Sequence, residues 1–187
     1  MFKRCHPRET GVAVQVVMSS QPQSESSELP LISANGVDYR YLQDLLKAGE
    51  WLEADMETAR RMLEAARKEA EAWLEIADID NFPGEDLHIL DQLWLNYSKG
   101  RFGFSVQAQI YRSLGGTRNY DEKIWEAFGD RTGWCQHTAW LYYSDLTFNL
   151  SAPPGHLPAL GWHPFMGYGG EIGWWAALFS RPELSAT

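Results

Sequence analysis

Few residues in this 187-residue chain have the types and spacing that covalent chemistry would require. Cys135 and His137 lie two positions apart, which is close enough in sequence to suggest a nucleophile and its base. Alternate residues of a strand point to opposite faces, however, and no third side chain is placed to orient the imidazole. We therefore expect Cys135 to be an unreactive, half-buried thiol.

The sequence contains no complete metal-binding or cofactor-binding motif. Residues 78–86, DIDNFPGED, space their acidic side chains roughly as a calcium loop does. Phe82 occupies a ligand position, and Pro83 stands where such a loop turns on glycine, so the pattern fails. The five histidines have no pairing that would build a metal site, and G-x-S-x-G, P-loop and Cys-x-x-Cys motifs are absent. The sequence predicts no catalytic residue and no metal ligand.

Aromatic residues offer a different chemistry, the binding of a flat apolar ligand. In RFGFSV, residues 101–106, Phe102 and Phe104 flank Gly103. Under one interpretation, Gly103 lets the backbone approach a ligand that both rings contact. Under the alternative, the two rings fill the core where two helices meet.

The stretch from Ala152 to Trp175 is the second aromatic candidate. It contains four prolines and six glycines, and Glu171 is its only charged residue. Prolines and glycines at this density exclude a long helix or a central strand. The stretch is therefore either an ordered lid over the core or an apolar surface for a ligand or partner.

Composition limits the partners and the compartment. The formal net charge of −9 disfavours nucleic acid and anionic membranes as main partners. Two cysteines make no disulfide framework, which favours a reducing compartment, and the N-terminal stretch lacks an obvious signal-peptide cleavage site. The uncharged run over 146–170 is broken by prolines and glycines, so we expect at most peripheral membrane association.

The elements that position these residues are predicted to be mainly α-helices. Residues 1–37, with the linker SSQPQSESSELP, are expected to be a weakly ordered tail, and residues 38–187 one helical domain. Gly49 is placed to end a first helix, Ser105 to cap a later one, and residues 133–143 to form a small β-hairpin. Amphipathic periods predict helices within 37–51, 53–74, 82–100, 106–114, 120–129 and 174–181.

The second of these helices has an apolar stripe. Met56, Ala59, Leu63 and Ala66 recur at helical spacing, with charged residues between them. We expect this stripe to be the buried face and the charged residues to face water.

Five stretches in one order carry a resemblance to a known family: EADMETARRML, DLHILDQLWLNYSKGRFGFSVQ, FGDRTGW, YSDLTFNLSAPPGHLP and LFSR. Over about residues 39–181 the chain resembles the "genomes uncoupled" family of porphyrin-binding regulators of magnesium chelatase in oxygenic phototrophs. The resemblance implies a compact all-helical domain shaped like a cupped hand, with an apolar palm for protoporphyrin IX or its magnesium form. It also implies stimulation of the chelatase through its large porphyrin-binding subunit, rather than catalysis by the chain itself.

The resemblance further implies a set of ligand-binding residues and a location. The loop over 151–170 would form fingers above the palm, and no tightly bound cofactor is expected. The location would be the cyanobacterial cytoplasm or the plastid stroma, at most peripheral at thylakoids. The implied porphyrin-binding residues are Phe102, Phe104, Val106, Trp140, Phe148, Leu150, His156, Leu157, Trp162, Phe165 and Arg181.

Departures from the family pattern keep an alternative open. Porphyrin propionates need cationic partners, and the finger loop supplies no arginine before Arg181, so that Arg101, Arg112 and Arg131 become candidates. The tail over 1–37 is also shorter than the helical domain that often precedes the palm, and Cys135 replaces an expected basic residue. The alternative is a sensory or scaffold domain that binds a bilin, a haem or a protein partner without stimulating chelation.

Overall fold

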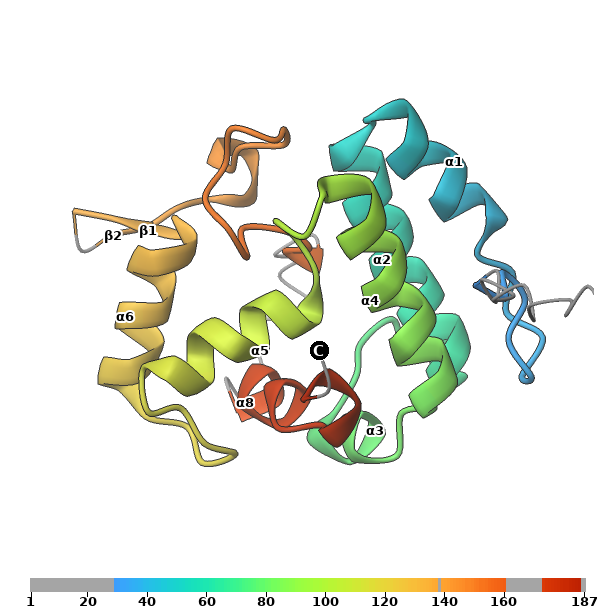
Figure 1. The fold of residues 1–187 in the computed structure, drawn as a ribbon. Coiled ribbons are helices and arrows are strands. Elements are labelled where there is room, and N and C mark those ends of the chain that lie inside the picture. Colours follow the sequence, from blue (N-terminus) through green and yellow to red (C-terminus); the bar gives the residue numbers. More distant parts are fainter. Residues whose placement is uncertain (1–28, 138, 161–172, 186–187) are drawn as a thin grey trace, which may run out of the picture.

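The computed structural model describes residues 29–137, 139–160 and 173–185, and this part of the chain is mainly α-helical, as predicted (Figure 1). Among these residues, no helix is both long and apolar enough to cross a membrane. The elements are α1 (Arg40–Ala48), α2 (Trp51–Ala66), α3 (Ile76–Asp80), α4 (Gly84–Ser98), α5 (Phe104–Ser113), α6 (Glu122–Thr132), β1 (Cys135–Gln136), β2 (Ala139–Trp140), η1 (Tyr143–Asp145), α8 (Gly173–Phe179) and η3 (Pro182–Leu184).

Local signals account for most helix ends. Gly49 ends α1 in the left-handed conformation, with φ 78°, and its N–H bonds the last turn. Asp121 caps α6 by accepting the backbone N–H of Ile124. The predicted cap at Ser105 is wrong, because α5 already begins at Phe104. The N–H of Ser105 instead donates to the buried carboxylate of Asp91, at 2.8 Å.

The predicted β-hairpin is present. Cys135 pairs with Trp140 and Gln136 with Ala139 in an antiparallel ladder. The hairpin follows α6 directly and packs against it, and the thiol of Cys135 is buried. The turn therefore brings Trp140 back onto the helix that precedes it.

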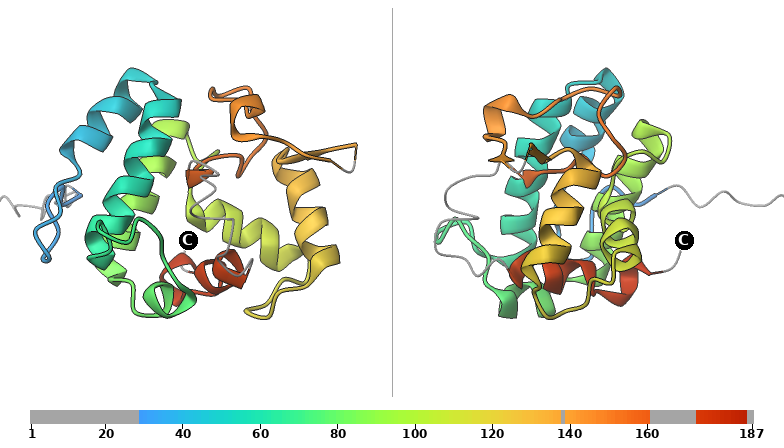
Figure 2. Two further views of the ribbon diagram at one scale, coloured as in Figure 1. Left: turned by 180° about the vertical axis from the view of Figure 1, so that it is seen from behind. Right: turned by 90° about the vertical axis from the view of Figure 1, so that its left-hand side faces the viewer.

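The helices form two groups (Figures 1 and 2). One group contains α1, α2 and α4, which pack on one another; the other contains α5, α6 and the hairpin. Between them, α8 packs on α3 and α5, and η3 packs on α4 and α5. Residues 155–157 join the groups as well, since Gly155 N–H donates to Arg101 O and Gly103 N–H to Leu157 O.

Residues just before the domain boundary expected at residue 38 pack on the helices. Ile32 forms an isolated antiparallel bridge with Asp38, and the N–H of Tyr39 donates to Leu31 O at 2.7 Å. Val37 is buried in the core, and the Asn35 amide donates to Asp86 on α4. Residues 31–37 therefore belong to the folded domain, while 1–28 lie outside the described residues.

The buried face of α2 differs from the predicted stripe. Met56 is 49% exposed and Leu52 37% exposed, and Ala59, Leu63 and Ala66 are only partly buried. The face that enters the core includes two acidic residues and is formed by Trp51, Ala54, Asp55, Glu57, Thr58, Met62 and Ala65.

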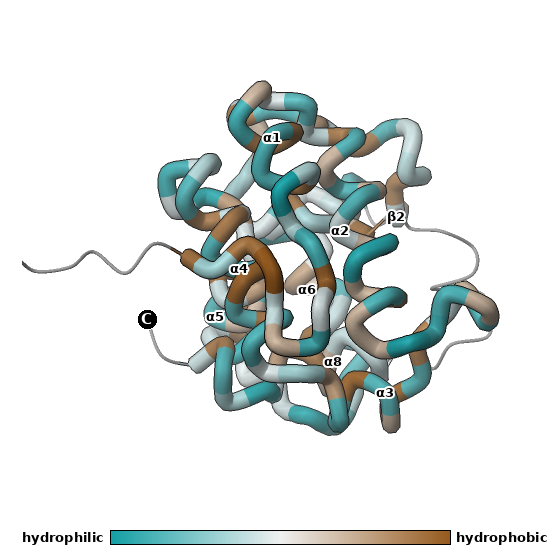
Figure 3. Tube along the Cα trace, turned by 90° about the vertical axis from the view of Figure 1, so that its right-hand side faces the viewer, coloured by the Kyte–Doolittle hydropathy of each residue, from teal (hydrophilic) through white to brown (hydrophobic). Residues whose placement is uncertain are grey.

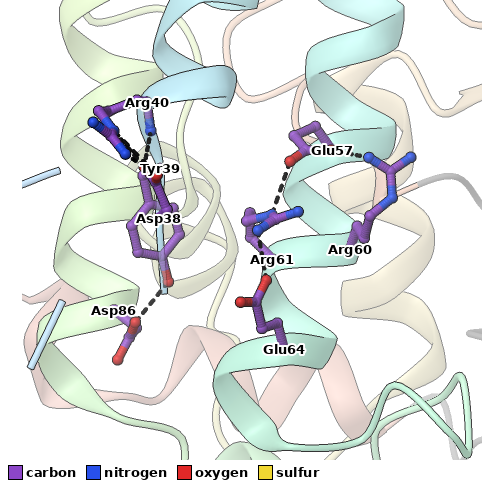
Figure 4. A network of polar contacts seen from close by, with 8 residues as sticks. All are labelled: Asp38, Tyr39, Arg40, Glu57, Arg60, Arg61, Glu64 and Asp86. Carbon is purple, nitrogen blue, oxygen red and sulfur yellow. Dashed lines mark hydrogen bonds and ion pairs between the residues drawn. The ribbon is translucent and has the colours of Figure 1, made fainter. Parts of the chain in front are cut away.

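Partners for the buried polar side chains of α2 make their burial possible. Glu57, 1% exposed, forms ion pairs with Arg60 and Arg61 one turn along the helix (Figure 4). Thr58 accepts a hydrogen bond from the buried indole of Trp94, at 2.9 Å. Buried polar groups are tolerated where they are paired in this way. Elsewhere, hydrophobic and hydrophilic positions alternate along the helices, as expected for amphipathic packing (Figure 3).

Candidate functional site

Aromatic side chains from α5, α6, the hairpin and α8 gather in one cluster, here called the indole cluster. The indole of Trp125 lies at its centre, stacked on Trp140 at 5.7 Å and 21°, and tilted against Trp175 at 6.4 Å and 31°. Ring contacts connect its members, which are Tyr111, Trp125, Phe128, Trp134, Trp140, Trp175 and Phe179.

Two members of the indole cluster reach the surface. Trp125, Trp134, Phe128, Phe179 and Tyr111 are all buried, whereas Trp140 and Trp175 are partly exposed. Both partly exposed indoles contact buried Trp125, so the indole cluster presents apolar aromatic surface to the outside. Such a surface suits a flat aromatic ligand, since stacked rings gain about 0.5–1.5 kcal/mol beyond the burial of area.

The segment that follows the hairpin adds further apolar side chains. The rings of Tyr143 and Phe148 contact at 5.1 Å, and Phe148 is half-buried. Tyr142 is 81% exposed and Leu150 40% exposed. Residues 139–150 therefore carry three of the predicted site residues, Trp140, Phe148 and Leu150, on one connected surface segment.

Phe102 and Phe104 are placed in the core, the alternative considered from the sequence. Both are 0% exposed, and Phe102 packs edge-on against Trp51 at 5.6 Å. Gly103 has φ 138°, and a Cβ there would lie 2.9 Å from Asp91 Oδ1, so its backbone approaches this carboxylate. In this structure the two rings present no surface to a ligand, and Gly103 serves the packing of α4 on α5.

The remaining predicted site residues are buried, are partly buried or lie outside the described residues. His156 is 2% exposed; its Nδ1 lies 2.6 Å from Thr132 O, and its Nε2 accepts the N–H of Thr147 at 3.0 Å. Burial lowers the pKa of His156, which favours the neutral ring that these two bonds need. Leu157 is fully buried, and Val106 on α5 is half-buried. Trp162 and Phe165 lie outside the described residues.

Three of the four candidate arginines hold the fold together. Arg101 donates to Ala152 O, and Arg112 to Leu184 O and Phe179 O. Arg181 donates to the carbonyls of Ile79, Asp80 and Phe82 and pairs with Glu183. Arg131 is exposed and has no hydrogen bond within the described ranges, so its guanidinium is accessible to an anion. The same ranges contain no group of three His, Cys, Asp or Glu that could hold a metal.

Comparison with known proteins identifies the family. Residues 32–165 match the GUN4-like family. The chain belongs to this family. It is 37% identical over 134 residues to the Ycf53-like protein of Synechocystis. The aligned region covers 70% of this chain and 54% of that protein.

Two further relatives extend the comparison of this GUN4-like chain. The chloroplastic tetrapyrrole-binding protein of Arabidopsis thaliana is 28% identical over 123 residues, covering 63% of this chain and 46% of that protein. The structure of GUN4 from Chlamydomonas reinhardtii superposes with a TM-score of 0.69 at 28% identity, covering 84% of this chain and 96% of that one. The chain thus spans about half the length of the relatives matched by sequence, and it shares the GUN4 fold.

Sequence reasoning missed three residues in or near this candidate site. Trp175 was predicted only as part of a short helix. The two adjacent tryptophans at the start of that helix could have indicated an aromatic binding surface. Gly129 lies inside α6, where a glycine weakens a helix, and this cost could have indicated that another group packs closely against it. Asp55 gave no signal, because acidic residues on α2 were expected to face water.

The role of Gly129 is testable. A Cβ at this position would lie 2.6 Å from the Trp140 ring and 3.1 Å from Cys135 Cβ. We expect Gly129→Ala to displace the Trp140 indole from Trp125 and to lower the melting temperature, although alanine favours helices by about 1 kcal/mol. Near-ultraviolet circular dichroism and a thermal melt measure the two effects.

A double variant provides the control for this prediction. With Trp140→Ala in place, the ring is gone, so adding Gly129→Ala should be neutral or stabilising. Equal destabilisation in both backgrounds would show that Gly129 does not seat the indole.

Proposed function

We propose that this GUN4-like chain binds a tetrapyrrole, protoporphyrin IX or its magnesium complex, and thereby activates magnesium chelatase without catalysing a reaction itself. The observation that carries the proposal is the pair of partly exposed indoles, Trp140 and Trp175, which both contact buried Trp125, the first stacked and the second tilted. A relative named as a tetrapyrrole-binding protein supports the ligand class. The chelatase, through its large porphyrin-binding subunit, is the partner that the family resemblance implies.

The proposed site combines an apolar face with a small number of polar groups. Trp140, Trp175, Phe148 and Leu150 would cover the macrocycle, whose flat faces are apolar. Arg131 would pair with a propionate, because it can do so without giving up a hydrogen bond that holds the described fold. Phe102, Phe104, His156 and Leu157 would contribute only through the packing of the core, as buried residues.

The proposed function also implies a location for the protein. A tetrapyrrole carrier of this kind belongs where chlorophyll precursors are made, in the cyanobacterial cytoplasm or the plastid stroma. The net charge of −9 is consistent with at most peripheral contact with anionic thylakoid lipids.

Two measurements test the proposed function. We expect deuteroporphyrin or protoporphyrin IX to quench tryptophan fluorescence at low-micromolar concentration or below, and magnesium porphyrin to bind more tightly. Added to reconstituted chelatase subunits, the protein should raise the rate of chelation. Absence of quenching up to the solubility limit of the porphyrin would overturn the binding proposal.

A second candidate function is a bilin- or haem-binding sensory or scaffold domain. Three of the four cations considered for propionates are bonded to backbone carbonyls. This bears equally on porphyrin, haem and bilin, which all carry propionates, so the effect on chelation is what separates the two candidates. Tetrapyrrole binding with an unchanged chelation rate would support this candidate over the first.

A further inference from the structure

Asp55 is a fully buried carboxylate in α2 that binds two separate parts of the chain. Its Oδ1 accepts the backbone N–H groups of Ala159 and Leu160, at 2.5 and 3.1 Å. Its Oδ2 accepts the hydroxyl of Tyr143 in η1, at 2.9 Å. One side chain therefore ties residues 159–160 and the segment over 139–150 to the same turn of α2.

Both tied segments border the proposed tetrapyrrole site. Tyr143 contacts Phe148 and lies three residues beyond Trp140, which stacks on the indole cluster. Residues 155–160 follow Leu150 and Ala152 and run back toward the connection between α4 and α5. The carboxylate thus fixes the positions of two stretches that neither a helix nor a long strand holds in place.

We infer that Asp55 is a positioning residue for tetrapyrrole binding, which holds both bordering segments in the arrangement that the ligand meets. This inference rests on the proposed function. Asp55 itself is buried beneath these segments and acts through Tyr143, Ala159 and Leu160.

The chemistry explains why a carboxylate stands here rather than an apolar residue. Burying a charge is costly unless it is paired or hydrogen-bonded, and the hydroxyl of Tyr143 and the two backbone N–H groups offset that cost for Asp55. Leu160 has φ 56°, a left-handed conformation that leucine rarely adopts, and its N–H is one of these donors. A strong, fixed acceptor on α2 holds the backbone in this conformation, which an apolar side chain could not do.

The chain contains a matched control for this arrangement. Tyr39 donates its hydroxyl to Asp86 at 2.7 Å, and both side chains are 0% exposed (Figure 4). This pair joins the start of α1 to α4, in the helix group that does not contain the indole cluster (Figure 1). Tyr39→Phe and Tyr143→Phe therefore remove the same kind of bond at two different places.

Porphyrin titration of these two variants is the first test. We expect Tyr143→Phe, which keeps the ring contact with Phe148, to raise the Kd for deuteroporphyrin about fivefold or more. Tyr39→Phe should lower the melting temperature at least as much and leave the Kd within twofold of the wild type. Equal Kd values for both variants and the wild type would overturn the inference.

Amide hydrogen exchange on the ligand-free protein is the second test and needs no porphyrin. We expect Asp55→Asn to accelerate exchange at residues 159 and 160, while amides in α4 remain as protected as in the wild type. Unchanged exchange at 159 and 160 would overturn the inference even if the wild type binds porphyrin. If the wild type failed to bind porphyrin while Asp55→Asn showed the expected exchange, the proposed function and the positioning role would both be overturned. Asp55 would then have a structural role only.

Discussion

Replacement of Arg181 by alanine is expected to destabilise the fold by about 3 kcal/mol, because its guanidinium is hydrogen-bonded to carbonyls at the end of α3. It donates to the carbonyl oxygens of Ile79, Asp80 and Phe82, and its side chain is 11% exposed. Hydrogen bonds to charged groups contribute about 1.5–3 kcal/mol each, but these share one side chain and do not add fully. For a domain of this size, the melting temperature should fall by about 6–12 °C.

Arg118 is the matched control for this prediction. It also reaches α3, where it pairs with the Asp80 carboxylate, but the two side chains are 50% and 39% exposed. Exposed ion pairs contribute about 0–1 kcal/mol, so Arg118→Ala should barely change the melt. If Arg181→Ala melted like the wild type and bound porphyrin weakly, Arg181 would be a propionate ligand, as the family resemblance first implied.

Trp140→Ala is expected to give the largest loss of porphyrin affinity among single variants of the described residues. The indole would lose both its apolar contact area and its stacking on the macrocycle, together about 2 kcal/mol. This corresponds to about a 30-fold increase in Kd. Because the ring is already partly exposed, the loss of stability should be smaller, about 1–2 kcal/mol. Fluorescence titration and a thermal melt on the same sample separate the two effects.

Tyr41→Ala provides the control for the removal of a surface ring. Tyr41 lies on α1 and is 58% exposed, in the helix group without the indole cluster. Its loss should leave the Kd within twofold of the wild type. A Trp140→Ala protein that binds porphyrin normally would show that the ligand does not use this end of the indole cluster.

Local signals in the sequence were sufficient for most of the helices and for the hairpin, although α3 was not predicted. Gly49 ends α1 and Asp121 caps α6 through bonds within a few residues, so short stretches of sequence contain the cause. The hairpin at Cys135–Trp140 follows from β-favouring residues around a short turn. The family resemblance added the expectation of a tetrapyrrole ligand, and it named Trp140, Phe148 and Leu150, which the structure places on one surface segment.

Burial and long-range pairing were decided only by the tertiary structure. The stripe of Met56 on α2 seemed the natural core face, yet the helix is rotated so that Asp55 and Glu57 are buried. Glu57 pairs with arginines of the same helix, so the partners that favour this rotation are those of Asp55. They include a tyrosine 88 positions away and two backbone amides 104 and 105 positions away. The periodicity of one helix contains no information about such distant donors. A sequence pattern shows which residues can share a face, but the bonds available to a buried carboxylate determine which face the protein buries.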